Sequence, residues 1–350
     1  MRIGRRQIDS AQLPYIIAEL GVNHDGRPDH ALALVDAAHR AGADAIKLQY
    51  FEADRLLGKA ARLAAYQQRA GAADPLALLG ALELSRHQMV PIVQHAHERN
   101  LHAIVSIFSV ELVTHAEQLP FDAYKTASTD IIHRPLIEAM IATGKPLILS
   151  TGAATLDEIA DATAWLGNHP HLLMHCVSSY PTPDEDAALA GRLAMLPVNP
   201  NALGYSDHTT ALDTGALAVA SGACLLEKHL TLDRAATGPD HEASLNPDGL
   251  TEYIRLARRA WRMRGPIEKT VSDIERDVRA VSRQSITAAR ELPVGHVLTA
   301  ADLTIKRPGS GLSPARLDSI IGCRLARPIE AGMPLTEQDL ALHAEPAVAA

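Results

Sequence analysis

Short apolar runs recur along roughly the first 230 residues, and each is followed by a polar turn and a segment with helical periodicity. The apolar runs are Tyr15–Leu20, Ala45–Gln49, Ala103–Phe108, Ala123–Thr126, Pro146–Ser150, Leu172–Cys176, Leu203–Ser206 and Leu225–His229. Helical periodicity between them is clearest in Asp29–Ala41, Val110–Leu119, Thr155–Asn168 and Leu212–Ala220. Strands that alternate with helices predict a parallel sheet, and continuous apolar runs predict strands buried on both faces. Eight such units, with no G-x-G-x-x-G after the first, favour an α/β fold of the (β/α)8 TIM-barrel type over an open doubly wound sheet.

A different pattern follows the last of these units. After Arg264 the chain is charged to about Val281, as in a linker or a helix, and then the motif G-x-x-L-T-x-x-D-L occurs twice, beginning at Gly295 and at Gly332. In each copy a threonine is followed three residues later by an aspartate, which is the spacing of a capping box. The pattern predicts a small, internally repeated second domain. We expect a barrel over residues 1–268, a linker over 269–284, the small domain over 285–341 and a disordered tail over 342–350.

Composition is that of an ordinary globular protein, with 47% hydrophobic and 21% charged residues among 350. The longest nearly apolar run, Gly215–Leu226, is far shorter than the roughly 20 residues of a membrane span. The basic start of the chain is followed by polar residues instead of the apolar stretch of a signal peptide. Three widely spaced cysteines predict neither a disulfide framework nor a metal site of the C-x-x-C type. These features predict a cytoplasmic protein with no membrane partner.

The net charge of −8 and the lack of a basic stripe argue against nucleic acid as a partner. The charge is uneven, because residues 283–337 carry an excess of Lys and Arg over Asp and Glu while the rest of the chain is acidic. The segment Lys306–Gly311 within this region is a basic, glycine-bearing loop suited to approach an anion. The opposite charges of the acidic barrel region and the basic second domain indicate that the two regions contact each other.

Every one of the eight apolar runs ends in side chains that form hydrogen bonds or carry charge. These residues are Glu19, Lys47, Gln49, Ser106, Lys125, Ser128, Ser150, His175, Ser178, Tyr180, Ser206, His208, Glu227 and His229. In a barrel the carboxyl ends of the strands build one active site. Contact with solvent would explain one serine or lysine at a strand end, but it explains poorly why all eight ends are polar. The pattern therefore predicts an enzyme.

The ordered set of motifs resembles the sialic acid synthase family. The motifs are A-E-L-G-V-N-H-D-G from Ala18, K-L-Q from Lys47, Y-K-T-A-S from Tyr124, L-S-T-G from Leu149, H-C-V-S-S-Y-P-T-P from His175, G-Y-S-D-H-T from Gly204, E-K-H from Glu227 and G-P-D-H from Gly238. The second domain resembles the family's antifreeze-like SAF domain, a β-clip fold, most clearly in K-R-P-G-S-G from Lys306. The resemblance covers nearly the whole chain. It implies a transferase that condenses phosphoenolpyruvate with an N-acyl-mannosamine-type sugar to give a nine-carbon ulosonic acid and phosphate.

The resemblance also implies roles for the strand-end residues. Phosphoenolpyruvate needs positive charge and many donors, which Lys47 and Lys125 and the hydroxyls of Ser106, Ser128, Ser150, Ser178 and Ser206 supply. An alternative is a pyruvate-dependent aldolase in which one of the two lysines forms a Schiff base. Glu19 is the candidate general acid/base or electrostatic support, with Glu227 in reserve.

His208 and His229 end adjacent strands, so they can converge on a divalent cation, which the family implies is Mn²⁺, with Mg²⁺ or Co²⁺ as alternatives. The expected mechanism has the cation polarise the sugar aldehyde while C3 of phosphoenolpyruvate attacks it; water then adds at C2 and phosphate leaves by C–O cleavage. The family-matched sugar-binding positions are Gln49, Asp130, Tyr180, Asp240 and Arg307. His24, His175 and His241 are expected to play supporting roles. The family further implies a domain-swapped homodimer in which Arg307 reaches the partner's site.

Three positions depart from the common family pattern. Ser178 stands where many members have Asn, Ser106-Ile-Phe replaces Ser-Thr-Pro-Phe, and Asp130 stands where Glu is common. A serine at position 178 is similar to the pattern in those branches of the family that make legionaminic, pseudaminic or related bacterial sugars. These departures leave the exact sugar open, and whether it is 6-phosphorylated is open as well. A non-enzymatic carbohydrate-binding protein is the remaining alternative.

Overall fold

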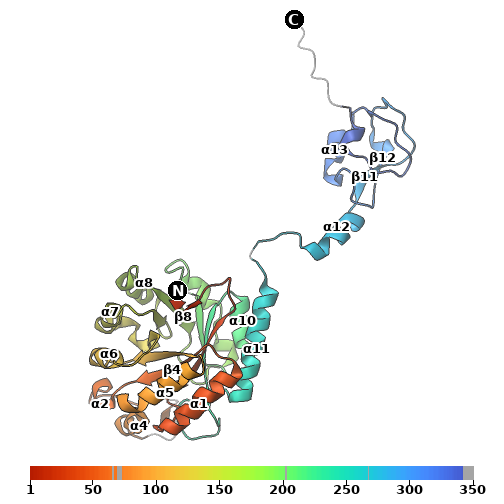
Figure 1. Cartoon of the computed structure of the whole chain (residues 1–350). Coiled ribbons are helices and arrows are strands. Elements are labelled where there is room, and N and C mark those ends of the chain that lie inside the picture. Colours follow the sequence, from red (N-terminus) through yellow and green to blue (C-terminus); the bar gives the residue numbers. More distant parts are fainter. Residues whose placement is uncertain (65–66, 69–72, 202, 267, 342–350) are drawn as a thin grey trace. The chain divides into compact units, whose positions relative to one another are not determined.

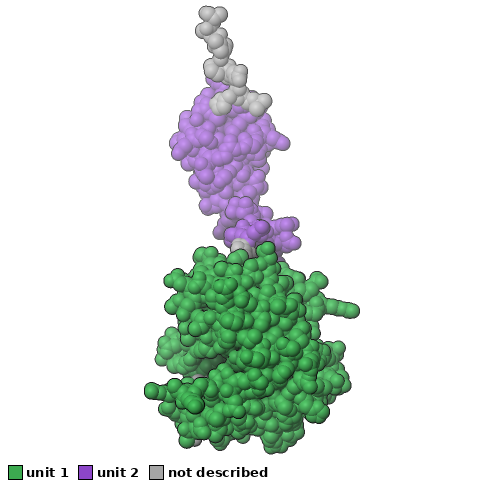
Figure 2. All heavy atoms as spheres, turned by 90° about the vertical axis from the view of Figure 1, so that its left-hand side faces the viewer, with its two compact units in different colours: residues 1–265 green, residues 266–350 purple. Residues whose placement is uncertain are grey.

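The computed structural model describes residues 1–64, 67–68, 73–201, 203–266 and 268–341. The chain forms two compact units, Met1–Gly265 and Pro266–Ala350, which Figure 2 shows in green and purple. The division falls three residues before the end of the barrel region expected from the sequence. The tail expected to be disordered, 342–350, lies outside the described residues.

Unit 1 is a closed barrel of eight parallel strands, which confirms the predicted TIM barrel (Figure 1). Around the ring the order is β10-β3-β4-β5-β6-β7-β8-β9. The strands are β3 (Tyr15–Gly21), β4 (Ala45–Tyr50), β5 (His102–Ile107), β6 (Ala123–Thr126), β7 (Leu147–Ser150), β8 (His171–Cys176), β9 (Gly204–Asp207) and β10 (Leu225–His229). Each bound lies within one residue of the apolar run that predicted it. A two-strand hairpin of β1 (Arg2–Ile3) and β2 (Arg6–Gln7) was not predicted, since two-residue strands carry no periodicity.

Helices cover the outside of the ring. They are α1 (Pro28–Ala41), α2 (Ala53–Leu56), α4 (Pro75–Leu82), α5 (Arg86–Glu98), α6 (Val110–Ala116), α7 (Arg134–Ala142), α8 (Leu156–Leu166), α9 (Gly191–Met195), α10 (Thr214–Ala220) and α11 (Pro247–Arg264). Local sequence sets their starts: Ser85 with Gln88 and Thr155 with Glu158 form capping boxes at α5 and α8. Across the described parts of the chain, no helix combines the length and the apolar character that a membrane crossing requires.

Two apolar cores hold the barrel together, one between strands and helices and one inside the ring. Inside the ring, inward residues near the amino ends of the strands are apolar, as in Ile17, Ile104 and Ile148. Ile3 and Ile8, from the hairpin region, join this inner core. Two positions further along β3 and β5 the inward residues become Glu19 and Ser106, because side chains alternate along a strand. The inner apolar core therefore lies directly below the polar groups, toward the amino ends of the strands.

Unit 2 is a small domain around its own apolar core. Its elements are η3 (Asp273–Glu275), α12 (Arg276–Ser282), β11 (Ser285–Ala288), η4 (Ala300–Asp302), β12 (Leu303–Lys306), η5 (Pro314–Arg316), α13 (Leu317–Ile320) and η6 (Glu337–Asp339). Both predicted capping boxes are present, Thr299 with Asp302 and Thr336 with Asp339. Both copies of the repeated sequence motif thus form the same local structure, a capping box at the start of a short helical turn.

We expect low pH to lower the folding stability of unit 2, because it protonates Asp302. Hydrogen bonds from His296 (2.8 Å) and Thr299 (2.7 Å), together with Arg290, hold the pKa of this buried carboxyl well below its usual range. A lowered folded-state pKa stabilises the fold above the unfolded value of about 3.9, and this stability is lost as the pH falls below it. Asp302→Asn should cost about 1.5–3 kcal/mol at neutral pH, because charge-assisted hydrogen bonds are lost. Hydrogen exchange of β11 amides measures this; equal exchange in Asp302→Asn and in the exposed-site control Asp318→Asn would contradict it.

Candidate active site

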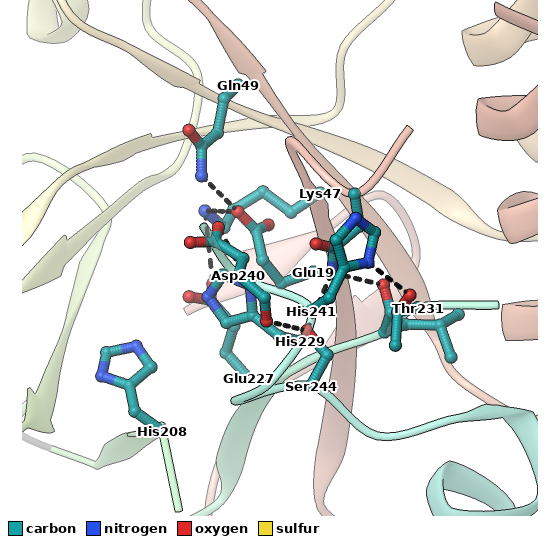
Figure 3. A network of polar contacts seen from close by, with 12 residues as sticks. Glu19, Lys47, Gln49, His208, Glu227, His229, Thr231, Asp240, His241 and Ser244 are labelled. Atoms are coloured by element: carbon teal, nitrogen blue, oxygen red, sulfur yellow. Dashed lines mark hydrogen bonds and ion pairs between the residues drawn. The ribbon is translucent and has the colours of Figure 1, made fainter. Parts of the chain in front are cut away.

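Two carboxylates and two lysines meet at the carboxyl ends of the strands. Figure 3 shows three of these groups, Glu19, Glu227 and Lys47. Lys47 Nζ lies 2.9 Å from Glu19 Oε1 and 3.8 Å from Glu227 Oε2. Lys125 Nζ lies 3.2 Å from Glu227 Oε1. Strand register brings them together, since Glu19 pairs with Lys47 across β3 and β4. All four side chains are buried, so their charges interact with little screening.

Burial and charge set the pKa of each group. Burial raises the pKa of Glu19; Lys47 opposes this shift and Glu227 adds to it. For Glu227, burial is outweighed by Lys125 and Lys47, and its pKa falls below the usual value. Burial lowers the pKa of Lys125, whereas Glu19 and Glu227 overcome burial at Lys47 and raise its pKa. The two carboxylates are therefore different in kind, with Glu19 the more easily protonated.

Hydroxyl groups extend this cluster along the neighbouring strand ends. Lys47 Nζ donates to Ser106 Oγ at 3.0 Å, and Ser206 Oγ donates to Glu227 Oε1 at 3.0 Å. Ser150 Oγ is buried without a hydrogen-bond partner. A buried hydroxyl without a partner is costly, so a hydrogen bond from Ser150 to a ligand would be favourable. The structure thus joins two of the five serines expected from the sequence to the cluster of lysines and carboxylates, and Ser150 ends the strand β7.

The other two serines gather around Gly152, beyond the end of β7. A Cβ at Gly152 would lie 2.3 Å from Ser178 Oγ, 2.7 Å from Cys176 Sγ and 2.9 Å from Ser128 Oγ. The absent side chain leaves a small cradle lined by two hydroxyls and a thiol, and Ser178 is exposed at its rim. The sequence did not point to Cys176, although its inward place on β8, in step with Leu172 and Met174, was the available signal.

His208 and His229 lie side by side, with ring centroids 5.6 Å apart. Burial lowers the pKa of His208 to about 4 and that of His229 well below its usual value, so both rings are neutral. His208 Nδ1 donates to the Val177 carbonyl at 2.6 Å, which leaves the lone pair on Nε2 for a ligand. His229 Nδ1 is buried without a hydrogen-bond partner. Two neutral imidazoles with these properties fit a divalent cation whose other positions are open.

No protein cage surrounds that pair: within residues 1–341, apart from the few undescribed positions, no three His, Cys, Asp or Glu side chains are grouped to hold a metal. A cation here would need water or substrate oxygens to complete its coordination. The expectation of Mn²⁺, with Mg²⁺ or Co²⁺ as alternatives, stays a prediction.

The predicted sugar-binding residues fall into three groups. Gln49, Tyr180 and Asp240 border the cluster: Gln49 Nε2 donates to Glu19 Oε1 at 3.0 Å, and the Tyr180 ring lies 4.1 Å from that of His208. Burial, with Glu19 adding to it, raises the pKa of Asp240 to about 7. Asp130 lies in η1 (Ser128–Ile132), where burial raises its pKa to about 6 and Oδ2 has no partner. Arg307 is exposed in unit 2.

Glycine at position 21 allows this crowding. Gly21 adopts φ +51°, and a Cβ there would lie 3.2 Å from Glu19 Oε1 and 3.3 Å from both Asp240 Oδ2 and Gln49 Nε2. A side chain at this position would push the three polar groups apart. The positive φ favours glycine independently.

The supporting histidines have separate surroundings. His175 points away from the ring and contacts the Ala188 carbonyl at 2.9 Å. Burial lowers the pKa of His24 to about 4, and its Nδ1 accepts from the Gly26 amide. His241 Nε2 lies 3.0 Å from Asp25 Oδ1. None of these three rings is among the groups that face Lys47 or Lys125.

An ion pair on the outer face of the ring was missed. Lys228 and Asp207 are fully buried, and Lys228 Nζ lies 3.2 Å from Asp207 Oδ2. They are direct partners across β10 and β9. The motifs S-D-H and E-K-H contain both residues at their central positions. Because side chains alternate along a strand, Asp207 and Lys228 face outward when the residues before and after them face inward.

Comparisons with known proteins agree with this geometry. A model of the NeuB family matches residues 34–269, and a model of the SAF domain matches residues 283–341. The chain is 35% identical over 335 residues to the N,N'-diacetyllegionaminic acid synthase of Legionella pneumophila, covering 93% of this chain and 94% of the relative. It is 33% identical over 314 residues to the enzyme of the same name from Campylobacter jejuni, covering 88% and 94%. The solved N-acetylneuraminic acid synthetase of Leptospira borgpetersenii, in complex with citrate, has 29% identity and a TM-score of 0.73, covering 79% of this chain and 94% of that one.

Proposed function

Because the chain belongs to the NeuB family, we propose that it condenses phosphoenolpyruvate with an N-acyl-mannosamine-type sugar to form a nonulosonic acid and phosphate. The family membership confirms the resemblance to sialic acid synthases inferred from the strand-end motifs. The observation that carries the reaction is the buried pair Lys47 and Lys125 beside serine hydroxyls. This arrangement suits a small, highly charged phosphate ester.

The residues divide the chemistry among them. Lys47, Lys125 and the serines bind the carboxylate and phosphate of phosphoenolpyruvate. C3 of phosphoenolpyruvate forms the bond to the sugar aldehyde carbon; water adds at C2, and the C2–O bond to phosphate breaks. We assign Glu19 to proton transfer in these steps, because its pKa is raised and its Oε2 has no hydrogen-bond partner. A divalent cation held by His208 and His229 would supply Lewis-acid polarisation of the sugar carbonyl.

We further propose that the sugar carries two acetamido groups. Two relatives of more than 30% identity are named N,N'-diacetyllegionaminic acid synthases, and Ser178 in place of Asn resembles the same branch. A product with two N-acetyl groups requires an acceptor that already bears both, since phosphoenolpyruvate contributes none. The expected acceptor is therefore a 2,4-diacetamido-trideoxy hexose of manno configuration.

Phosphate release from phosphoenolpyruvate tests both proposals. The purified chain with Mn²⁺ is supplied with N-acetylmannosamine, its 6-phosphate, or the diacetamido-trideoxy hexose. We expect release that depends on sugar, with the diacetamido sugar giving the highest kcat/KM. No release with any of the three would overturn the proposed reaction, and preference for the 6-phosphate would overturn only the choice of sugar.

A Schiff-base aldolase is the second candidate, and the lowered pKa of Lys125 is the observation that favours it. Borohydride reduction in the presence of pyruvate would trap such an adduct on Lys125. We expect no adduct, because Glu227 lies 3.2 Å from Lys125 Nζ and favours the charged ammonium. A trapped peptide containing Lys125 would favour the aldolase.

Filling the cradle at Gly152 is expected to weaken phosphoenolpyruvate binding. In Gly152→Ala the new Cβ would meet the oxygens of Ser178 and Ser128 at less than 3 Å, so the cradle closes. We expect KM for phosphoenolpyruvate to rise by about tenfold or more, roughly the 1.4 kcal/mol of one lost hydrogen bond. The control is Gly80→Ala, where nothing lies within 4 Å. Equal KM values for the two variants would contradict the assignment.

We also propose a cytoplasmic, domain-swapped homodimer in which Arg307 from the partner's SAF domain contacts the N-acyl group. The basic, exposed loop that carries Arg307 and the acidic character of the rest of the chain support this proposal. Arg307→Ala should chiefly raise KM for the sugar, with kcat little changed, because uniform binding is lost. Steady-state kinetics measure this, and an unchanged sugar KM would remove Arg307 from the site.

A further inference from the structure

The segment 231–245, between β10 and α11, leaves the ring and returns to the same place. Leu230 and Leu245 form a parallel bridge. The Thr231 amide donates to the Leu245 carbonyl at 2.9 Å, and the Leu245 amide donates to the His229 carbonyl at 2.9 Å. We call this segment the 231–245 loop. Its base is fixed on β10, so the placement of Asp240 depends on what holds the rest of the loop.

One anchor holds the backbone of Asp240. Ser244 Oγ donates to the Asp240 carbonyl at 2.6 Å and accepts from Asn23 Nδ2 at 2.8 Å. Asn23 Nδ2 also donates to the Leu230 carbonyl at 2.9 Å. Asn23 follows β3, so this anchor joins the loop to the start of the β3–α1 connection.

A second anchor is the imidazole of His241, the residue after Asp240 (Figure 3). His241 Nδ1 lies 2.7 Å from Thr231 Oγ1, and Nε2 lies 3.0 Å from Asp25 Oδ1. Asp25 adopts φ +55°, which non-glycine residues rarely do, so this contact fastens an unusual backbone turn. A Cβ at Gly238 would lie 2.7 Å from the His241 ring, so the loop leaves room for the ring only with glycine there.

The two anchors together position the Asp240 carboxyl in the site. Asp240 is buried, and its Oδ2 lies 3.5 Å from His229 Nδ1. We propose that His241 is a positioning residue: by joining Thr231 to Asp25 it fixes the 231–245 loop so that Asp240 stays beside His229 and Glu19. His241 itself is directed away from the reacting groups, toward Asp25. The expected effect of His241 on turnover rests on the proposed function.

The test measures whether His241 acts through Asp240. His241→Ala is made in the wild-type chain and in an Asp240→Asn chain, and kcat and both KM values are determined. We expect kcat to fall about 10–100-fold in the wild-type background, the range typical of groups that orient ligands, with KM for phosphoenolpyruvate within about twofold. In the Asp240→Asn background the same substitution should cost no more than about twofold. Equal losses in both backgrounds, or no loss in the wild type, would overturn the proposal.

Two further measurements separate positioning from general damage. His241→Gln retains a nitrogen donor toward Asp25 and should recover part of the loss, while the matched control His175→Ala should change kcat little. If His241→Ala does not fold, Asp25→Asn weakens the same contact and takes its place.

Affinity for Mn²⁺, measured by titration calorimetry, gives a readout besides turnover. His241→Ala should weaken it about tenfold through Asp240 and His229. Should the wild-type chain release no phosphate with any sugar, the proposed function fails while this affinity still tests the anchor. An unchanged Mn²⁺ affinity in that case would overturn the role of His241.

Discussion

His229→Ala should lower turnover by roughly 1,000-fold, equivalent to about 4 kcal/mol of lost transition-state stabilisation. The centroids of the neutral, buried rings of His208 and His229 lie 5.6 Å apart, and removing one ring would leave the proposed cation with a single protein ligand. A lone imidazole holds a divalent ion weakly. Phosphate release under saturating substrates measures the effect.

Metal removal provides the companion measurement. Chelation should abolish wild-type turnover, and added Mn²⁺ should restore the wild type but not His229→Ala. His175→Ala is the matched control, because this histidine also lies near the end of a strand, yet its ring contacts the Ala188 carbonyl and not the lysines or carboxylates of the site. Full activity after chelation would remove the metal from the mechanism, and equal losses in the two variants would show a structural effect alone.

Lys228→Met should destabilise the barrel by about 3–5 kcal/mol, because it leaves Asp207 buried without its cationic partner. Both side chains are fully buried, and Lys228 also donates to the Thr209 carbonyl and lies 5.6 Å from the Tyr253 ring. Asp207 keeps the hydrogen bonds from the amide and the hydroxyl of Thr209, which are not ionic. Urea unfolding followed by tryptophan fluorescence reports on this unit, since Trp165 and Trp261 are the two tryptophans of the chain.

A double variant identifies the cause. Adding Asp207→Asn to Lys228→Met removes the unpaired charge while a side-chain oxygen stays available to Thr209, so most of the lost stability should return. If the double variant is no more stable than Lys228→Met, lost packing and not the stranded carboxylate explains the effect. A fall of less than about 1 kcal/mol in the single variant would mean that the pair is nearly neutral.

The barrel could be predicted closely because its strands are apolar runs that end where polar side chains begin. Tyr15, Ala123 and Leu225 open β3, β6 and β10 as expected, and the polar ends of the strands do converge. The same alternation explains two misses. Cys176 points inward and Lys228 points outward, and the polarity of a strand end does not by itself assign either residue to a face.

Other parts of the site depend on contacts that no local pattern encodes. His241 and Asp25 are 216 residues apart in the chain, and their contact depends on the shape of two irregular connections. The cradle at Gly152 likewise depends on a missing side chain, and it brings Ser128 of η1 next to Cys176 and Ser178 at the end of β8. Charge balance is also a property of the assembled ring: Glu19 and Glu227 look alike in sequence, yet their pKa values shift in opposite directions.

The order of the strands has a consequence for how such an enzyme can change during evolution. Lys47, Ser106, Lys125 and Ser150 come from the consecutive strands β4, β5, β6 and β7. Glu19, His229 and His208 come from the adjoining arc of β3, β10 and the end of β9, and Asp240 follows β10. Under the proposed function, the first arc supplies both lysines that bind the shared donor, and the second arc supplies the two histidines and Asp240 that face the variable acceptor. Ser206 on β9 and Gln49 on β4 are exceptions to this division. Changes in the second arc and its loops can thus alter the acceptor while the two lysines stay constant.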